Sequence, residues 1–184
     1  GREKMQLAIM EKLPHDLKGM RVLDAGCGTG VLSRMLDERG AEVVGVDISE
    51  KLIDVAKNRS VANKNIEYFA GDMKEQSFGN FDYIIAMDSL IHYSPEDTLS
   101  SIAEFSKRAN NAVVFTIIPS TFVLRTKLRL GKCFPKSERS PEVVPIGWDN
   151  LHRLEAIKSN VSLKKIARIK RFFYISEAWE FANK

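Results

Sequence analysis

An apolar strand that runs directly into a glycine-rich loop constrains the fold of this chain more than any other feature. The segment reads VLDAGCGTG at residues 22–30. Glycines at three alternate positions place no Cβ between the backbone and a ligand, and they allow the positive φ angles of a tight loop. The helix expected next, at about residues 31–39, directs its free N–H groups to the same place. The segment therefore predicts a ligand-binding loop, the alternative being a tight glycine turn that binds nothing.

A second apolar strand, at residues 41–47, ends in a carboxylate that supports the ligand-binding interpretation. Asp47 follows Gly30 by 17 residues, where a doubly wound sheet places the acid that binds ribose hydroxyls. Dinucleotide-binding loops have the spacing G-x-G-x-x-G, whereas the third glycine here comes one residue earlier and the loop opens with Asp24. An acid at that position suits a ligand with an ammonium group and no phosphate, and S-adenosylmethionine is such a ligand.

The loop resembles the first motif of class I S-adenosylmethionine-dependent methyltransferases, (V/L)-L-D-x-G-x-G-x-G, and the following segments keep that family's order. Strands are expected at residues 65–70, 81–88 and 111–118, and helices at 49–59 and 95–108, with Ser49 as an N-cap and Pro95 in a first turn. This alternation is typical of a parallel sheet covered on both faces. The expected fold class is therefore α/β and Rossmann-like. The resemblance implies a seven-stranded, mostly parallel sheet with an antiparallel last strand, and an acceptor lid inserted after the fifth strand, at residues 119–147.

The resemblance also implies which residues bind S-adenosylmethionine. They lie in the glycine loop, after the second strand, after the third strand where the family places an acid near the adenine amine, and at the end of the fourth. These residues are Asp24, Gly26, Cys27, Gly28, Gly30, Asp47, Ile48, Asp72, Met73 and Met87. No metal site is expected in the protein itself.

Length and composition agree with a single domain that spans residues 1–184. The chain is 44% hydrophobic, which is enough for a substantial core. No apolar run approaches the roughly 20 residues that span a bilayer, and no signal peptide opens the chain, so a cytoplasmic location is expected. We expect Cys27 and Cys133 to be reduced thiols, and neither is a good candidate for a nucleophile.

Charge is distributed unevenly along the chain. Residues 1–120 contain 14 Lys and Arg against 18 Asp and Glu, whereas residues 121–184 contain 14 against 6. The basic part suits an anionic partner, and nucleic acid, an acidic membrane surface and a substrate with carboxylates all remain open. Nucleobase amino methyltransferases carry (D/N)-P-P-(Y/F) after the fourth strand, and this chain has MDSL at residues 87–90. We therefore expect no nucleic-acid partner.

Three further segments indicate the acceptor. They read MDSLIHY at residues 87–93, LGKCFPKSERSP at 130–141 and FYISEA at 173–178. Together they closely resemble the magnesium-protoporphyrin IX O-methyltransferase family of chlorophyll and bacteriochlorophyll synthesis. The resemblance implies magnesium-protoporphyrin IX as substrate, the porphyrin-binding subunit of magnesium chelatase as a partner, and peripheral contact with a photosynthetic membrane. Family members also carry an N-terminal arm, which we expect to be absent from this chain because its sequence begins within the first helix.

Methylation of a propionate makes modest chemical demands on the protein. A carboxylic acid is already ionised at neutral pH and needs no general base, and charge is lost on the way to the transition state, which a dry pocket favours. His92 is expected to orient the propionate or to approach the porphyrin magnesium, and Tyr93 to act beside it, the alternative for both being a structural role. Ser89 and a basic cluster are expected to contact the porphyrin, the alternative for the cluster being a solvated surface. The cluster comprises Arg125, Arg129, Lys132 and Arg139.

Two other functions are left open by the residues. One is an O-methyltransferase for a phenolic small molecule, which needs a base because a phenol is protonated at neutral pH. The other is a carrier of porphyrin or RNA that retains the cofactor fold without catalysis. Equilibrium binding of magnesium-protoporphyrin, with and without S-adenosylmethionine, followed by a turnover assay on the same sample, distinguishes the three.

Overall fold

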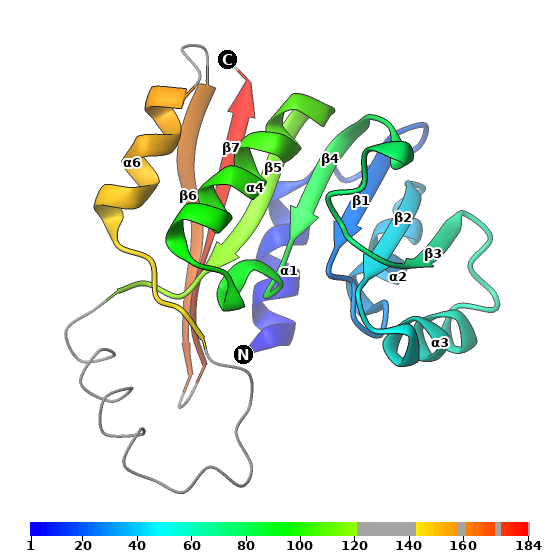
Figure 1. The fold of residues 1–184 in the computed structure, drawn as a ribbon. Coiled ribbons are helices and arrows are strands. Elements are labelled where there is room, and N and C mark those ends of the chain that lie inside the picture. Colours follow the sequence, from blue (N-terminus) through cyan, green and yellow to red (C-terminus); the bar gives the residue numbers. More distant parts are fainter. Residues whose placement is uncertain (121–142, 158–160, 172–173, 184) are drawn as a thin grey trace, which may run out of the picture.

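A computed structural model describes residues 1–120, 143–157, 161–171 and 174–183. One seven-stranded sheet runs through the molecule in the order β3-β2-β1-β4-β5-β7-β6 (Figure 1). The strands are β1 (Arg21–Ala25), β2 (Glu42–Asp47), β3 (Ile66–Ala70), β4 (Phe81–Ala86), β5 (Ala109–Ile117), β6 (Val161–Arg171) and β7 (Tyr174–Asn183). Strands β1 to β5 are parallel, and β7 pairs antiparallel with both β5 and β6. The predicted fold class and the reversed last strand are confirmed.

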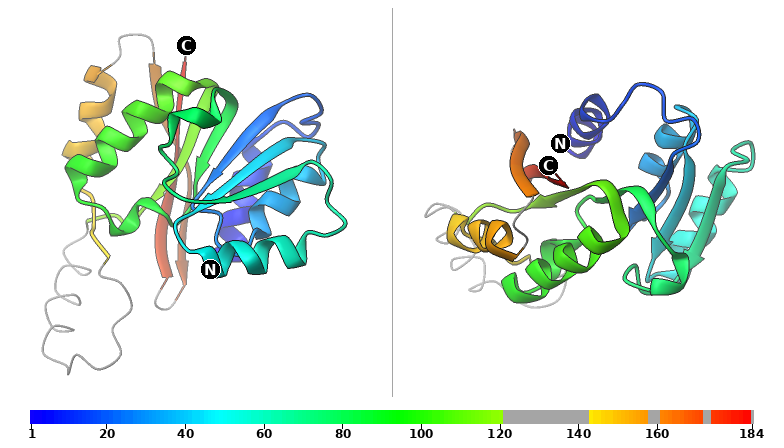
Figure 2. Two further views of the ribbon diagram at one scale, coloured as in Figure 1. Left: turned by 45° about the vertical axis from the view of Figure 1, so that its right-hand side comes forward. Right: turned by 90° about the horizontal axis from the view of Figure 1, so that it is seen from above.

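Helices cover both faces of the sheet. They are α1 (Arg2–Lys12), α2 (Val31–Asp37), α3 (Glu50–Arg59), α4 (Pro95–Arg108) and α6 (Trp148–Ile157), with short 3₁₀ turns η1 (Gln76–Phe78) and η2 (Leu90–His92). Helices α1 and α2 lie on one face and α4 and α6 on the other, as the view from above in Figure 2 shows. Each pair encloses its own group of buried apolar side chains against the sheet. None of the described helices is long and apolar enough to span a membrane.

The helix boundaries follow from local chemistry. Ser49 caps α3 by accepting a hydrogen bond from the Leu52 backbone N–H at 3.4 Å, and Ser94 caps α4 by accepting one from Asp97 at 3.0 Å. Pro95 occupies the first turn of α4, where its missing N–H costs nothing. Leu99, Ile102 and Phe105 of α4 are buried at the spacing of one helical face. These starts agree with those predicted for the two helices.

The fourth strand ends two residues earlier than the sequence predicts. It stops at Ala86 because Asp88 has φ 55°, in the left-handed region, and the Asp88 N–H donates to the side chain of Thr116 on β5 rather than to a backbone carbonyl of that strand. The helix after the glycine loop ends at Asp37 rather than Arg39, and Gly40 follows with φ 90°. Because β1, β2 and β4 are parallel neighbours, their carboxyl ends lie together at one edge of the sheet.

Most of the segment expected to form the acceptor lid lies outside the described residues, and so does Phe173. The residues that flank the lid segment are close together. The Ser120 N–H donates to the Ile146 carbonyl and the Ile146 N–H to the Ile118 carbonyl, both at 2.9 Å. The Val144 N–H also donates to the Ile91 carbonyl at 2.8 Å. The segment therefore leaves and rejoins the fold beside η2.

Candidate functional site

The glycine loop between β1 and α2 is held tightly by its neighbours. Gly26, Gly28 and Gly30 have φ angles of 83°, 55° and 71°. A Cβ on Gly26 would lie 2.3 Å from the Ser89 Cβ, and one on Gly30 would lie 2.2 Å from the Tyr68 hydroxyl oxygen. A Cβ on Gly28 would meet nothing within 4 Å. Two glycines therefore allow close packing, while Gly28 leaves the backbone open to a ligand.

Asp47 lies at the end of β2 and is fixed by two backbone groups. Its Oδ2 accepts a hydrogen bond from Gly28 N–H and its Oδ1 accepts one from Ser49 N–H, each at 2.9 Å. A carboxylate oxygen has two lone pairs, so each can accept another hydrogen bond. The next side chain, Ile48, is apolar and 86% exposed. A carboxylate beside an exposed apolar side chain matches the polar edge and apolar face of a nucleoside.

Asp24 is buried beneath the loop. Its Oδ2 accepts a hydrogen bond from the Ser33 hydroxyl at 2.6 Å. Burial raises the pKa of this carboxyl to about 6, despite the opposing effect of the Ser33 hydrogen bond. The carboxylate is therefore mostly ionised at neutral pH. Burial and the nearby Asp24 also raise the pKa of the Cys27 thiol, which keeps it protonated and unreactive.

A pocket opens beside the loop, and helix α1 forms one of its walls. It is lined by Arg2, Gln6, Asp24, Gly26, Cys27, Gly28, Thr29, Val31, Leu32 and Met87. Five of the predicted cofactor residues therefore meet in one place. Within the described ranges, no group of three or more His, Cys, Asp or Glu side chains could hold a metal ion.

Two further predicted residues follow β3. The Gly71 N–H donates to the Asp47 carbonyl at 3.0 Å, which fixes the turn that carries Asp72 next to the end of β2. Asp72 is exposed and its Oδ1 accepts a hydrogen bond from the Lys74 N–H at 2.9 Å. Met73 differs, because its side chain is buried in the core that faces α4. An acid is thus available at this edge, whereas Met73 packs inward.

The predicted acceptor residues surround η2. Ser89 lies against Gly26, and its Oγ is buried without a hydrogen-bond partner in the described structure. His92 is exposed, and Tyr93 is partly buried against the core. The four predicted cations of the lid are not among the described residues. The structure therefore brings Ser89 and His92 to the same edge as the cofactor pocket and leaves the contacts of the basic cluster as a prediction.

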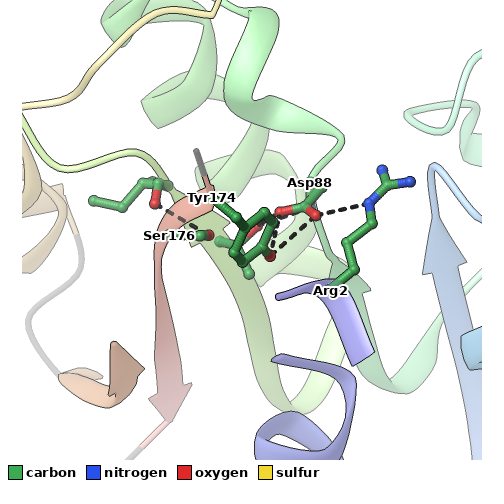
Figure 3. Close-up of polar contacts among 6 residues, drawn as sticks. Arg2, Asp88, Tyr174 and Ser176 are labelled. Carbon is green, nitrogen blue, oxygen red and sulfur yellow. Dashed lines mark hydrogen bonds and ion pairs between the residues drawn. The ribbon is translucent and has the colours of Figure 1, made fainter. Parts of the chain in front are cut away.

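The sequence interpretation missed a polar group that connects three distant elements at this edge (Figure 3). Asp88 is buried, and its carboxylate accepts hydrogen bonds from the Tyr174 hydroxyl at 3.1 and 3.2 Å and from Arg2 Nε at 3.1 Å. The Thr116 hydroxyl accepts from the Asp88 N–H at 2.7 Å and donates to Oδ1 at 3.2 Å. Both Asp88 and Tyr174 fall within the motifs MDSLIHY and FYISEA, which is the signal that could have indicated them.

The strand order, the reversed β7 and a glycine loop facing a strand-end carboxylate define a class I methyltransferase. A profile described as "Methyltransferase domain" matches residues 22–110, and one described as "Magnesium-protoporphyrin IX methyltransferase C-terminus" matches residues 86–183. The chain belongs to the magnesium-protoporphyrin IX methyltransferase family, which confirms the resemblance seen in its motifs.

Individual relatives support this assignment. The magnesium-protoporphyrin O-methyltransferase of Rhodobacter capsulatus is 45% identical over 183 residues, which cover 98% of this chain and 80% of that protein. A ubiquinone biosynthesis O-methyltransferase of Coxiella burnetii is 41% identical over 105 residues, covering 55% of this chain and 45% of that protein. The crystal structure of magnesium protoporphyrin IX methyltransferase from Synechocystis PCC 6803 with bound SAH has a TM-score of 0.82 and 25% identity, covering 99% of this chain and 81% of that one.

Proposed function

We propose that this protein transfers a methyl group from S-adenosylmethionine to a propionate carboxylate of magnesium-protoporphyrin IX, giving the monomethyl ester in chlorophyll or bacteriochlorophyll biosynthesis. The likeness to the Rhodobacter capsulatus enzyme along nearly the whole chain carries this proposal. It is supported by a pocket whose residues suit the cofactor and by an adjoining edge where an acceptor can approach.

The residues that line the pocket, together with those at the ends of β2 and β3, suit S-adenosylmethionine from one end to the other. Asp47 accepts hydrogen bonds from the ribose hydroxyls, Ile48 contacts the adenine face, and Asp72 lies near the adenine amine. Gly28 leaves the backbone open, and the ionised Asp24 attracts the ammonium group. The cofactor supplies an electrophilic methyl group on a sulfonium, and Met87 lines the pocket on the side of the acceptor edge.

The acceptor side has to position a carboxylate rather than remove a proton from it. His92 lies on η2, after the end of β4, and is exposed enough to contact an acceptor. We assign it to orienting the reacting propionate within about 3 Å of the methyl carbon, a proximity effect worth several kcal/mol. Ser89 and Tyr93 border the same place. The basic cluster of the lid is assigned to the propionate that is not methylated.

Delivery of a flat apolar porphyrin suggests partners beyond the substrate. We assign a cytoplasmic location with peripheral contact at a photosynthetic membrane, and direct transfer of the porphyrin from the porphyrin-binding subunit of magnesium chelatase. Co-sedimentation with vesicles that contain anionic lipids tests the first contact, and stimulation of turnover by the chelatase subunit tests the second.

A phenolic acceptor is the second candidate, favoured by the likeness to the ubiquinone biosynthesis O-methyltransferase. A phenol has a pKa of about 10 and requires a base, whereas a propionate does not. The test is methyl transfer from labelled S-adenosylmethionine to magnesium-protoporphyrin and, separately, to a catechol, after equilibrium binding of each to the same sample. Methylation of the porphyrin alone supports the proposal. Methylation of the catechol alone, or porphyrin binding without turnover, contradicts it.

A further inference from the structure

We propose that Asp88 is a positioning residue that, together with Tyr174, holds the Arg2 guanidinium at the cofactor pocket. Cofactor affinity then depends on a hydroxyl group of β7 that does not line the pocket. This inference rests on the proposed function, because it concerns how the same pocket binds S-adenosylmethionine.

The first argument comes from the burial of Asp88. Its side chain is 4% exposed, whereas that of Arg2 is 72% exposed. A buried carboxylate is costly unless charged or polar groups compensate it, and here Tyr174, Thr116 and Arg2 all do so. Burial and the neighbouring Asp88 raise the pKa of the Tyr174 phenol, so it stays protonated and donates.

The backbone of Asp88 shows that its position is fixed. It is the one non-glycine residue with positive φ among those described, and its N–H is bonded to Thr116. Such a conformation is unfavourable for a residue with a Cβ and persists only where the surroundings impose it, often at functional sites. A carboxylate held this firmly is a suitable anchor for an exposed partner such as Arg2.

Arg2 needs such an anchor because of its place in α1. It is the first residue of the helix, where the helix dipole disfavours a positive charge. Its Nε is bonded to Asp88, which leaves the two terminal nitrogens to serve the pocket that Arg2 lines. A guanidinium pairs well with a carboxylate, and the α-carboxylate is the anionic group of S-adenosylmethionine. We therefore assign that carboxylate to Arg2.

Tyr174 supports the same place in a second way. A Cβ on Gly1 would lie 2.7 Å from the Tyr174 ring, so the start of α1 packs directly on it. Two residues further along β7, the Ser176 hydroxyl donates to the Ile117 carbonyl at 3.4 Å and ties β7 to β5 (Figure 3). The Tyr174 ring therefore packs against the start of α1, and the Tyr174 hydroxyl donates to the Asp88 carboxylate that binds Arg2.

The test is a double-mutant cycle on S-adenosylmethionine affinity, measured by calorimetry well below the unfolding temperature of every variant. Tyr174→Phe keeps the ring and removes only the hydroxyl, and we expect it to raise Kd about 3- to 10-fold. Arg2→Gln should raise Kd about 10-fold or more. If Tyr174 acts through Arg2, adding Tyr174→Phe to Arg2→Gln should change Kd less than twofold, because coupled residues are non-additive.

A matched control comes from the other end of α1. Lys12 Nζ lies 3.7 Å from Glu180 Oε2 and also joins α1 to β7, but neither residue lines the pocket. Lys12→Gln should leave Kd within twofold of the wild type. Asp88→Asn serves as a second variant and should raise Kd at least as much as Tyr174→Phe.

The possible results separate this inference from the function on which it rests. A wild-type protein that binds no S-adenosylmethionine overturns the proposed function. Wild-type binding with an unchanged Kd in Tyr174→Phe overturns only the positioning role of Asp88 and Tyr174. The role is also overturned if Tyr174→Phe raises Kd by the same factor in the Arg2→Gln background as in the wild type, because a merely structural hydroxyl would act independently of Arg2.

Discussion

Replacement of Asp47 by alanine is the most direct test of the cofactor site. The structure shows each carboxylate oxygen bonded to one backbone N–H, which leaves one further lone pair on each for the ribose hydroxyls. A hydrogen bond to a charged group contributes about 1.5–3 kcal/mol. Water can partly replace these bonds because Asp47 is only half-buried, so we expect a loss of about 2–4 kcal/mol for the pair. This corresponds to a Kd for S-adenosylmethionine that is about 30- to 700-fold higher.

Calorimetric titration with S-adenosylmethionine measures this change directly. Asp54→Ala is the matched control, since Asp54 lies exposed on α3 and carries the same charge. The released Gly28 and Ser49 N–H groups face a half-exposed site, so Asp47→Ala should still fold, with a lower free energy of unfolding. If Asp47→Ala binds within twofold of the wild type, the assignment of Asp47 to the ribose is wrong.

Three further predictions concern the acceptor, the pH dependence and the basic cluster. His92→Ala should lower kcat while the Kd for S-adenosylmethionine stays within about twofold. The control is replacement of the exposed His15 by alanine. A loss of cofactor affinity as large as the loss of kcat would indicate a structural histidine. Asp24 holds its proton more tightly in the folded protein, where its pKa is about 6 rather than 3.8, so stability should fall by about 3 kcal/mol between about pH 4 and pH 6. The free energy of unfolding of Asp24→Asn, measured with urea at several pH values, should lack this decrease with rising pH. The same decrease in Asp24→Asn and in the wild type would contradict the prediction. Neutralising the cluster residue that holds the unreactive propionate should raise KM for magnesium-protoporphyrin about 10- to 100-fold. Unchanged KM with weaker binding to anionic vesicles would indicate a membrane role instead. The variants are Arg125→Gln, Arg129→Gln, Lys132→Gln and Arg139→Gln.

The parts of the site that local sequence predicts are those built from one strand and its following turn. The glycine spacing, the acid at the end of β2 and the N-cap Ser49 each depend on neighbours within a few residues, and sequence patterns report such short-range geometry well. Met73 shows where this approach stops. The motif predicts Met73 beside Asp72 at the ligand, and that role stays a prediction. Whether a side chain after a strand turns outward or into the core depends on the helices that pack there, and the side chain of Met73 lies in the core that faces α4.

The network around Asp88 could not be read from local patterns, because its members meet only through the topology of the sheet. Asp88 is 86 residues from both Arg2 and Tyr174. Strand β7 runs opposite to β5, so it begins at the edge where the parallel strands end, and Thr116 of β5 lies between the exit of β4 and the start of β7. A parallel last strand would have placed Tyr174 at the other edge of the sheet. The reversed strand is therefore what allows the motifs MDSLIHY and FYISEA to share one buried carboxylate beside the cofactor pocket.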